Sequence, residues 1–157
     1  ADAWALWALV ARLQSDSAQR QARLAAASTL RPDRFDLALR FTHAALAGGD
    51  LPRARSALDR CQALAGTPAE AGAVMASEAA WLQLSGQNER ATQVLLKALT
   101  LPNPGAVAYS TLGELSLIAG RRDAAITAFN AALQRDPLLT AARSGLARAQ
   151  AKRPPTP

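Results

Sequence analysis

Residues 109–137 read YSTLGELSLIAGRRDAAITAFNAALQRDP, and this stretch decides the fold. Each half carries apolar residues at spacings of three and four, which is the pattern of an amphipathic helix. Ala119-Gly120-Arg121 stands between the halves, and glycine there permits the backbone conformation that commonly ends a helix. The stretch predicts two helices joined by a short turn, with Asp136-Pro137 as the N-cap and first residue of another helix.

Similar turns recur along the chain at a nearly constant interval. Gly86 and Gly120 are 34 residues apart, and Gly49 and Gly86 are 37 apart. A fixed period of this length is typical of helical repeat proteins, so each unit is interpreted as a pair of helices of about 12–14 residues. The spacing gives four units and one insert: 1–34, 35–68, 72–105 and 106–139, with the insert at 69–71.

The insert 69–71 is interpreted as extra helix. Thr67 and Glu70 have the spacing of a capping box, in which each side chain bonds the backbone amide near the other residue. The insert would then lengthen the first helix of the third unit by about one turn. A three-residue loop insertion is the alternative. Asn103-Pro104 is interpreted like Asp136-Pro137, as an N-cap followed by proline.

Composition also favours an all-α protein. Of the 157 residues, 39 are Ala and 24 are Leu, against 4 Val and 2 Ile. Ala and Leu lead the helix propensity order, whereas the scarce β-branched residues favour sheets. A β-sandwich and a doubly wound sheet are therefore disfavoured. The length fits one domain, taken as residues 1–153, with residues 154–157 as a disordered tail.

These units resemble the tetratricopeptide repeat (TPR) family, whose signature runs W-x2-L-G-x2-Y, then Ala, x3, Phe, and finally Pro. The fourth unit matches best, through Tyr109, Leu112, Gly113, Ala125, Phe129, Ala132 and Pro137. The sequence departs from this signature at several positions. Ser116 stands at the second aromatic position of the fourth unit, and small-residue positions hold Arg20 in the first unit and Trp81 in the third. The resemblance covers residues 1–139 and implies a right-handed solenoid of helix-turn-helix units.

Residues 138–152 are expected to form a capping helix. The last unit of a helical repeat leaves an apolar face that needs a cover. An apolar stripe suited to this runs along the segment: Leu138, Leu139, Ala142, Leu146 and Ala149. Its basic residues are interpreted as the solvated side of the cap. A docking role for nucleic acid, acidic protein or lipid is the alternative.

The net charge of +6 belongs mainly to the ends of the chain, because the units at 35–139 carry equal numbers of basic and acidic residues. A phosphate-binding stripe would need basic residues on one face of successive units, which argues against nucleic acid as the partner. No apolar run approaches the roughly 20 residues of a transmembrane helix, so no transmembrane segment is expected in this chain.

A catalytic function is not expected. The chain has one histidine, His43, and one cysteine, Cys61. The resemblance implies that they point in different directions, with Cys61 as a small buried residue. Neither a cluster of metal ligands nor a glycine-rich phosphate loop occurs in the sequence. The prediction is a protein without enzyme activity, cofactor or metal.

The resemblance implies a concave groove, lined by the first helix of each unit, that receives a peptide or helix of a partner. Carried over by position, the lining is Leu9, Asp36, Leu39, Arg40, His43, Ser77, Ala80, Gln83, Ser110, Thr111, Glu114 and Leu117. Arg40 and His43, one helical turn apart, are the strongest candidates. Because the lining is mostly small and apolar, the expected partner is a protein or peptide with an apolar or amphipathic segment.

The expected function is therefore a protein–protein interaction module within a larger bacterial envelope, export or secretion assembly. The excess of Arg over Lys and the high Ala content suggest a GC-rich bacterial genome. The compartment stays open between periplasm and cytoplasm, and only the analogy to the family favours the periplasm. The alternative is a self-associating scaffold or oligomerisation module that forms homo-oligomers through exposed apolar ends or convex faces.

Overall fold

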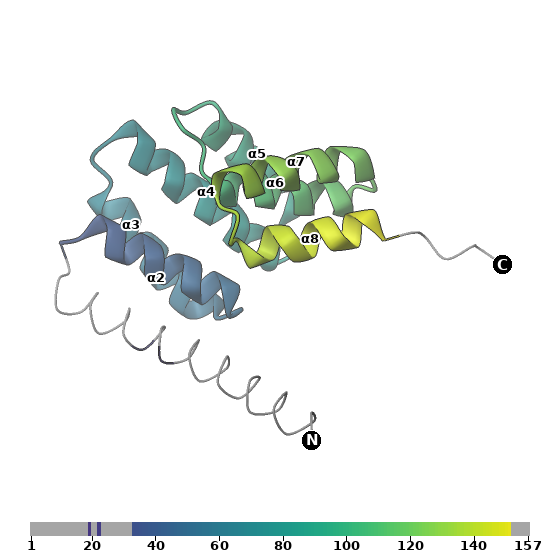
Figure 1. Ribbon diagram of the computed structural model, residues 1–157. Helices are drawn as coiled ribbons and strands as arrows, with labels where there is room; N and C mark the ends of the chain where they lie inside the picture. Colours follow the sequence, from purple (N-terminus) through teal and green to yellow (C-terminus); the bar gives the residue numbers. More distant parts are fainter. Residues whose placement is uncertain (1–18, 20–21, 23–32, 152–157) are drawn as a thin grey trace, which may run out of the picture.

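The computed structural model describes residues 33–151 together with Gln19 and Ala22. Residues 33–151 are all-helical, with seven helices and no strand. The helices are α2 (Phe35–Ala47), α3 (Leu51–Leu64), α4 (Pro68–Leu84), α5 (Asn88–Leu99), α6 (Ala106–Ile118), α7 (Arg122–Arg135) and α8 (Thr140–Gln150). Each helix packs against the next one in the chain (Figure 1).

The helices form two layers that repeat the same arrangement. The even-numbered helices lie side by side, since α2 contacts α4, α4 contacts α6, and α6 contacts α8. Each odd-numbered helix packs against the even-numbered helices before and after it. The starts of α6 and α8, at residues 106 and 140, keep the interval of 34 residues that the glycines predict. The described fold is therefore repeat-like.

Three turns of one kind join the helices within the pairs. Gly49, Gly86 and Gly120 follow α2, α4 and α6 with φ of +72°, +78° and +73°, a left-handed conformation that suits glycine. The next backbone N–H donates back into the helix, from Gln87 to the Leu82 carbonyl at 2.9 Å, for example. This is the Schellman arrangement, which satisfies the last carbonyls of the helix. The turns predicted at these glycines are confirmed.

The insert 69–71 is helical, as predicted. α4 has 17 residues, whereas α2 and α6 have 13 each. Thr67 Oγ1 accepts from the Glu70 backbone N–H at 3.2 Å, and the Glu70 carboxylate accepts from the Thr67 N–H at 3.0 Å. Hydrogen bonds from backbone N–H groups lower the pKa of the Glu70 carboxyl, and the bond from Gly66 has the largest effect. These donors stabilise the charged form of the carboxyl group. The capping box is confirmed.

The two other predicted N-caps are wrong. α6 begins at Ala106 with Gly105 as its N-cap, and Asn103 takes a left-handed conformation with φ of +54°. Asp136 ends α7, and its carboxylate accepts from the Leu138 N–H at 3.0 Å before α8 begins. Asn and Asp favour turns because their short polar side chains bond nearby backbone groups, and here the turns take both residues.

Buried small residues allow the helices to lie close together. Five alanines within the helix pairs have at most 1% of their surface exposed: Ala54, Ala91, Ala98, Ala125 and Ala132. The tightest contact surrounds Phe129 of α7, which is fully buried. A Cβ built on Gly113 of α6 would lie 2.5 Å from its ring, and one on Gly145 of α8 would lie 2.3 Å from it. A side chain at either position would force the ring or one of the helices to move.

Part of the expected organisation lies outside the described residues. Nearly all of the first unit, 1–34, and the tail at 154–157 are not among the described residues. The predicted groove residue Leu9 belongs to this part of the chain. The helix expected at 138–152 corresponds to α8, over Thr140–Gln150. None of the helices in the described part of the chain is long and apolar enough to cross a membrane.

Substituting Gly145 tests the contact at Phe129. Gly145→Ala is expected to lower the free energy of unfolding by about 1–3 kcal/mol, because the added methyl group overpacks a buried ring. Gly105→Ala is the matched control, since a Cβ there meets nothing within 4 Å. Urea denaturation monitored by circular dichroism measures both.

The double variant Phe129→Leu/Gly145→Ala is expected to lose less free energy of unfolding than the sum of the losses of the two single variants. The smaller leucine side chain relieves the clash with the added methyl group. Equal effects of Gly145→Ala and Gly105→Ala would contradict the contact.

Candidate functional site

A groove of about 590 Å³ opens between the four even-numbered helices. Its lining is His43, Leu46, Ala47, Ala80, Gln83, Leu84, Val107, Ser110, Thr111, Glu114, Leu139, Thr140, Ala141, Ser144 and Arg148. Seven of these fifteen residues are apolar and eight are polar, so the groove offers hydrogen-bonding groups between apolar walls. Its volume is in the usual range of ligand sites, about 300–1,000 Å³.

The groove contains half of the residues that the sequence assigns to the partner surface. These are His43, Ala80, Gln83, Ser110, Thr111 and Glu114. They come from α2, α4 and α6, whose sides lie next to one another in the even-numbered layer. The structure therefore brings together side chains from three units of the sequence.

The other predicted residues lie elsewhere. Leu39 packs with the buried cluster around Leu58 and Cys61, and Leu117 packs against the cluster that contains Phe129, because both are large and apolar. Ser77 is fully buried. Asp36 and Arg40 are exposed and do not line the groove. The Asp36 carboxylate forms an ion pair with Arg34 at 2.8 Å.

α8 forms a wall of the groove, although the sequence predicts it only as a cap. Leu139, Thr140, Ala141, Ser144 and Arg148 line this side. The Arg148 guanidinium donates a hydrogen bond to the Glu114 carboxylate of α6, which lies 34 residues earlier in the chain. The 34-residue interval places Thr140 one period after Ala106, but the interval does not show that this helix lines a groove. α8 therefore serves as the fourth even-numbered helix of the described layer.

The hydrogen bonds of Ser77 determine which nitrogen of His43 carries the proton. Ser77 Oγ lies 2.9 Å from the Ala73 carbonyl, which can only accept, so the hydroxyl proton points there. The same oxygen lies 3.1 Å from His43 Nε2. Ser77 must accept in this second contact, so Nε2 is the protonated nitrogen and Nδ1 of the neutral ring is an acceptor.

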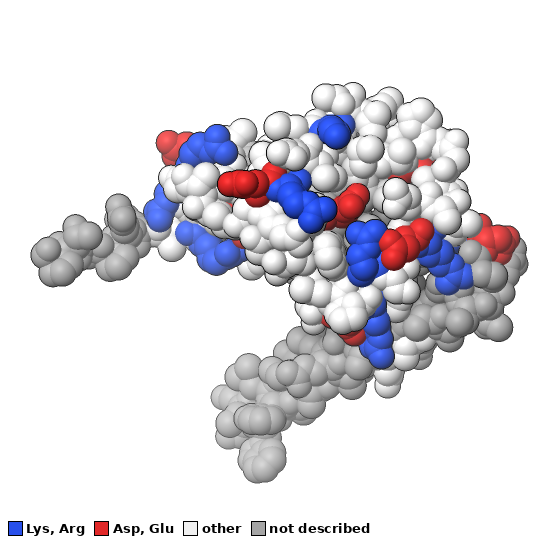
Figure 2. All heavy atoms as spheres, turned by 180° about the vertical axis from the view of Figure 1, so that it is seen from behind, with Lys and Arg blue, Asp and Glu red and all other residues white. Residues whose placement is uncertain are grey.

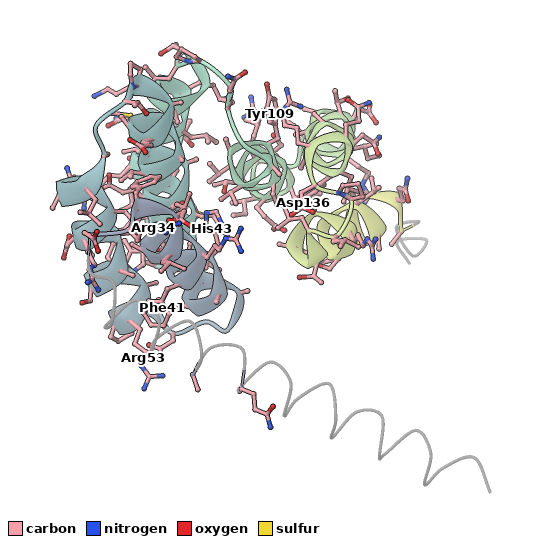
Figure 3. The ribbon with its side chains drawn as sticks, turned by 60° about the vertical axis from the view of Figure 1, so that its left-hand side comes forward. Arg34, Phe41, His43, Arg53, Tyr109 and Asp136 are labelled. Carbon is pink, nitrogen blue, oxygen red and sulfur yellow. The ribbon has the colours of Figure 1, made fainter. Side chains whose placement is uncertain are left out.

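Burial keeps the imidazole of His43 neutral. Removal from water lowers the pKa of His43 below its ordinary value, while the negative charge of Asp136 acts in the opposite direction. His43 belongs to α2 and Asp136 to the turn before α8, and the two residues face each other across the space between these elements (Figure 3). The ring is therefore a neutral hydrogen-bonding group in one wall.

Cys61 is separate from this site. It is fully buried, and its Sγ lies 3.6 Å from Thr42 Oγ1, within the layer contact between α2 and α3. Burial raises the pKa of the Cys61 thiol, so the reactive thiolate is disfavoured. Within residues 33–151, no group of three His, Cys, Asp or Glu side chains is arranged to hold a metal ion.

Comparisons with known proteins give no relative. No protein-family model matches the chain, and no curated protein or solved structure matches it. Inference about function therefore rests on the groove and on the chemistry of its lining.

Charge outside the groove is dispersed. Residues 33–151 contain 12 basic and 10 acidic side chains, so most of the net charge of +6 belongs to the rest of the chain. On the face seen in Figure 2, basic and acidic side chains lie beside one another, with uncharged areas between them. Among the described residues, several basic and acidic side chains form ion pairs, such as Arg55 with Glu78 at 3.7 Å. This distribution differs from the basic stripe of a nucleic-acid-binding surface.

The single histidine permits a direct test of its environment. We expect the His43 side chain to titrate below pH 6.5 in the folded protein, as followed by NMR chemical shifts. The folded state disfavours the protonated ring. The contribution of His43 to the free energy of unfolding should therefore be complete above pH 6.5 and should be lost as the pH falls towards the pKa of the folded state.

Variant His43→Gln should lose this pH dependence, as urea denaturation between pH 5 and 7.5 would show. The pKa values of Asp36, Asp59 and Glu70 are lowered by their hydrogen bonds, so these carboxyls take up protons at more acidic pH. A His43 pKa at or above 6.5 would contradict the buried neutral ring.

Proposed function

We propose that this chain is a non-catalytic protein-binding module that receives a peptide or helix of a partner in its groove. The observation that carries the proposal is the groove itself, about 590 Å³ between α2, α4, α6 and α8. Concave sites with apolar walls and a few convergent polar groups are where proteins bind ligands and partner segments. Four helices contribute to one continuous surface, which suits an elongated partner segment.

We infer further that the helix pairs are tetratricopeptide-type repeats in a right-handed solenoid. Three features support this inference: the 34-residue interval between α6 and α8, the left-handed glycine after α2, α4 and α6, and the buried alanines. Ala54, Ala91 and Ala125 follow these glycines at the same distance, five residues later, and all three are fully buried. The units thus share their contact positions as well as their length.

The proposal treats the Ser77–His43 contact as structural. A serine beside a histidine could suggest nucleophilic catalysis. Ser77 is fully buried, however, and its proton is donated to the Ala73 carbonyl. An oxygen in that position has no access to a substrate in the groove. We therefore assign the pair the task of holding the imidazole in place.

The resemblance adds a biological setting to the proposal. Tetratricopeptide modules act as adaptors, and we propose a place for this chain in a bacterial envelope, export or secretion assembly. A protein partner with an apolar or amphipathic segment suits the groove better than nucleic acid, because basic and acidic side chains are nearly balanced over residues 33–151.

Self-association is the second candidate function. Four large apolar side chains have about half or more of their surface exposed: Leu84, Leu96, Ile118 and Leu138. Leu84 and Ile118 end the neighbouring helices α4 and α6, 34 residues apart, and could join two copies of the chain. Light scattering over a concentration series tests this, since a strict monomer would eliminate it.

Filling the groove tests the proposed function. Linear peptides are first selected from a random library by binding to the wild-type protein. Ala141 and Ala147 are both exposed residues of α8, but only Ala141 lines the groove. Ala141→Trp is expected to weaken binding of the selected peptides at least tenfold by excluding them, which corresponds to about 1.4 kcal/mol.

Ala147→Trp is the matched control and should bind as the wild type does, as measured by fluorescence anisotropy. Equal binding by the two variants would show that the peptides bind outside the groove.

A further inference from the structure

We propose that the groove binds a peptide segment that combines apolar residues, packed on α2 and α4, with a neutral amide or hydroxyl side chain, hydrogen-bonded to Ser110 of α6. Ser110 is then the residue that determines specificity. The proposal rests on the proposed function and specifies the chemistry of the partner segment and its placement. Its basis is the unequal distribution of polar groups over the groove and one buried hydroxyl without a partner.

The two halves of the groove differ in polarity. α2 and α4 contribute six residues to the lining, and four of these are apolar: Leu46, Ala47, Ala80 and Leu84. The other nine belong to α6, α8 and the residue before α8, and six of these are polar: Ser110, Thr111, Glu114, Thr140, Ser144 and Arg148. Apolar side chains of a bound segment are therefore best placed on the first half and polar ones on the second.

Ser110 provides an unused polar group inside the groove. It belongs to α6, which lies between α4 and α8 in the even-numbered layer. Only 5% of its surface is exposed, and its hydroxyl makes no hydrogen bond within the described part of the chain. Among these residues, Asn88 Oδ1 is the one fully enclosed side-chain oxygen or nitrogen without a partner. The small exposed part of Ser110 therefore includes its hydroxyl, which opens onto the groove that Ser110 lines.

This hydroxyl favours a polar group on the partner. A wholly apolar segment would cover Ser110 and leave the hydroxyl without water or another hydrogen bond, which is unfavourable. Ser144 of α8 lines the same half and donates its own proton to the Ala141 carbonyl at 3.1 Å, so its oxygen is an acceptor towards a ligand. A side chain that donates hydrogen bonds suits both serines. Amide and hydroxyl side chains do so without carrying a charge.

The charges of the groove favour a neutral partner group. Glu114 and Arg148 are the charged residues of the lining, and the guanidinium donates a hydrogen bond to the carboxylate. Burial lowers the pKa of His43, so its ring is neutral. Asp136 lies outside the lining, and its carboxylate accepts from the Leu138 N–H at 3.0 Å. A charge on the bound segment would therefore lose water without gaining an unpaired counter-charge in the lining.

The test is a set of double-mutant cycles between the protein and a peptide selected against wild type from a random library. Alanine scanning of the peptide should identify a polar position that holds Asn, Gln, Ser or Thr. Alanine at this position is expected to weaken binding to wild type by about three- to tenfold, but binding to Ser110→Ala by less than twofold. Fluorescence anisotropy measures each dissociation constant.

Ser116→Ala is the matched control for Ser110→Ala. Ser116 is also a buried serine of α6, but it does not line the groove. In this variant the substitution at the polar position of the peptide should keep its full effect on binding.

A second cycle tests the placement of the apolar residues. Leu84 lines the groove and is 47% exposed, so Leu84→Ala removes an apolar wall without opening the core. Alanine at the main apolar position of the peptide should weaken binding to wild type and to Ser110→Ala equally, by about tenfold. The loss should be at least threefold smaller with Leu84→Ala.

Peptides with Asp or Lys at the polar position test the neutral charge, and both should bind wild type more weakly than the selected peptide. Tighter binding of either peptide, equal effects of the polar substitution on wild type and Ser110→Ala, or selected peptides that are apolar throughout would overturn the proposal. Self-association that Ala141→Trp abolishes would also overturn it, by assigning the groove to a second copy of the chain.

These results leave the groove itself as a binding site, whereas failure of Ala141→Trp to block peptide binding would contradict the proposed function. If Ser110→Ala does not fold, the cycle with Leu84→Ala and the Asp and Lys peptides decide the question.

Discussion

The groove depends on the packing of one aromatic ring. Phe129 of α7 is fully buried between α6 and α8, where Gly113 and Gly145 have no side chain to keep it out. The ring therefore contacts both backbones and joins three helices through one side chain. α8 forms a wall of the groove. Gly113 and Gly145 allow α8 to lie close to α6 and α7 around this ring, and this contact sets the position of the wall. Close packing of this kind leaves little freedom to adjust.

Hydrogen bonds between neighbouring even-numbered helices then fix the polar groups of the groove. His43 contacts Ser77, and Arg148 contacts Glu114, each across 34 residues of sequence. The first contact places the proton of the imidazole on Nε2. The second neutralises the charge of Glu114 beside the apolar lining. A surface with balanced charge favours a partner recognised by shape and hydrogen bonding.

Particular residues show where reasoning from sequence stops. Trp81 stands at a position where the repeat pattern has a small residue, and its indole N–H donates to the Leu51 carbonyl at 3.0 Å while Arg55 covers its ring. Asn103 before proline looks like an N-cap but takes a left-handed turn. Contacts with α3 accommodate the large Trp81 side chain, and the repeat pattern does not show those contacts. At Asn103 the residue type suits a turn as well as an N-cap, so the local pattern leaves both open. By contrast, Thr67 bonds only within its own turn and was predicted correctly.

The sequence by itself determined the all-helical class, the turns at Gly49, Gly86 and Gly120, and the extra turn of helix at 69–71. These features depend on propensity, periodicity and contacts between near neighbours, which a sequence shows directly. The tertiary structure alone decided that α8 lines the groove and that Ser77 is buried beneath His43. Such facts depend on how far each helix is rotated about its axis, and that rotation is set by close packing among side chains distant in the sequence.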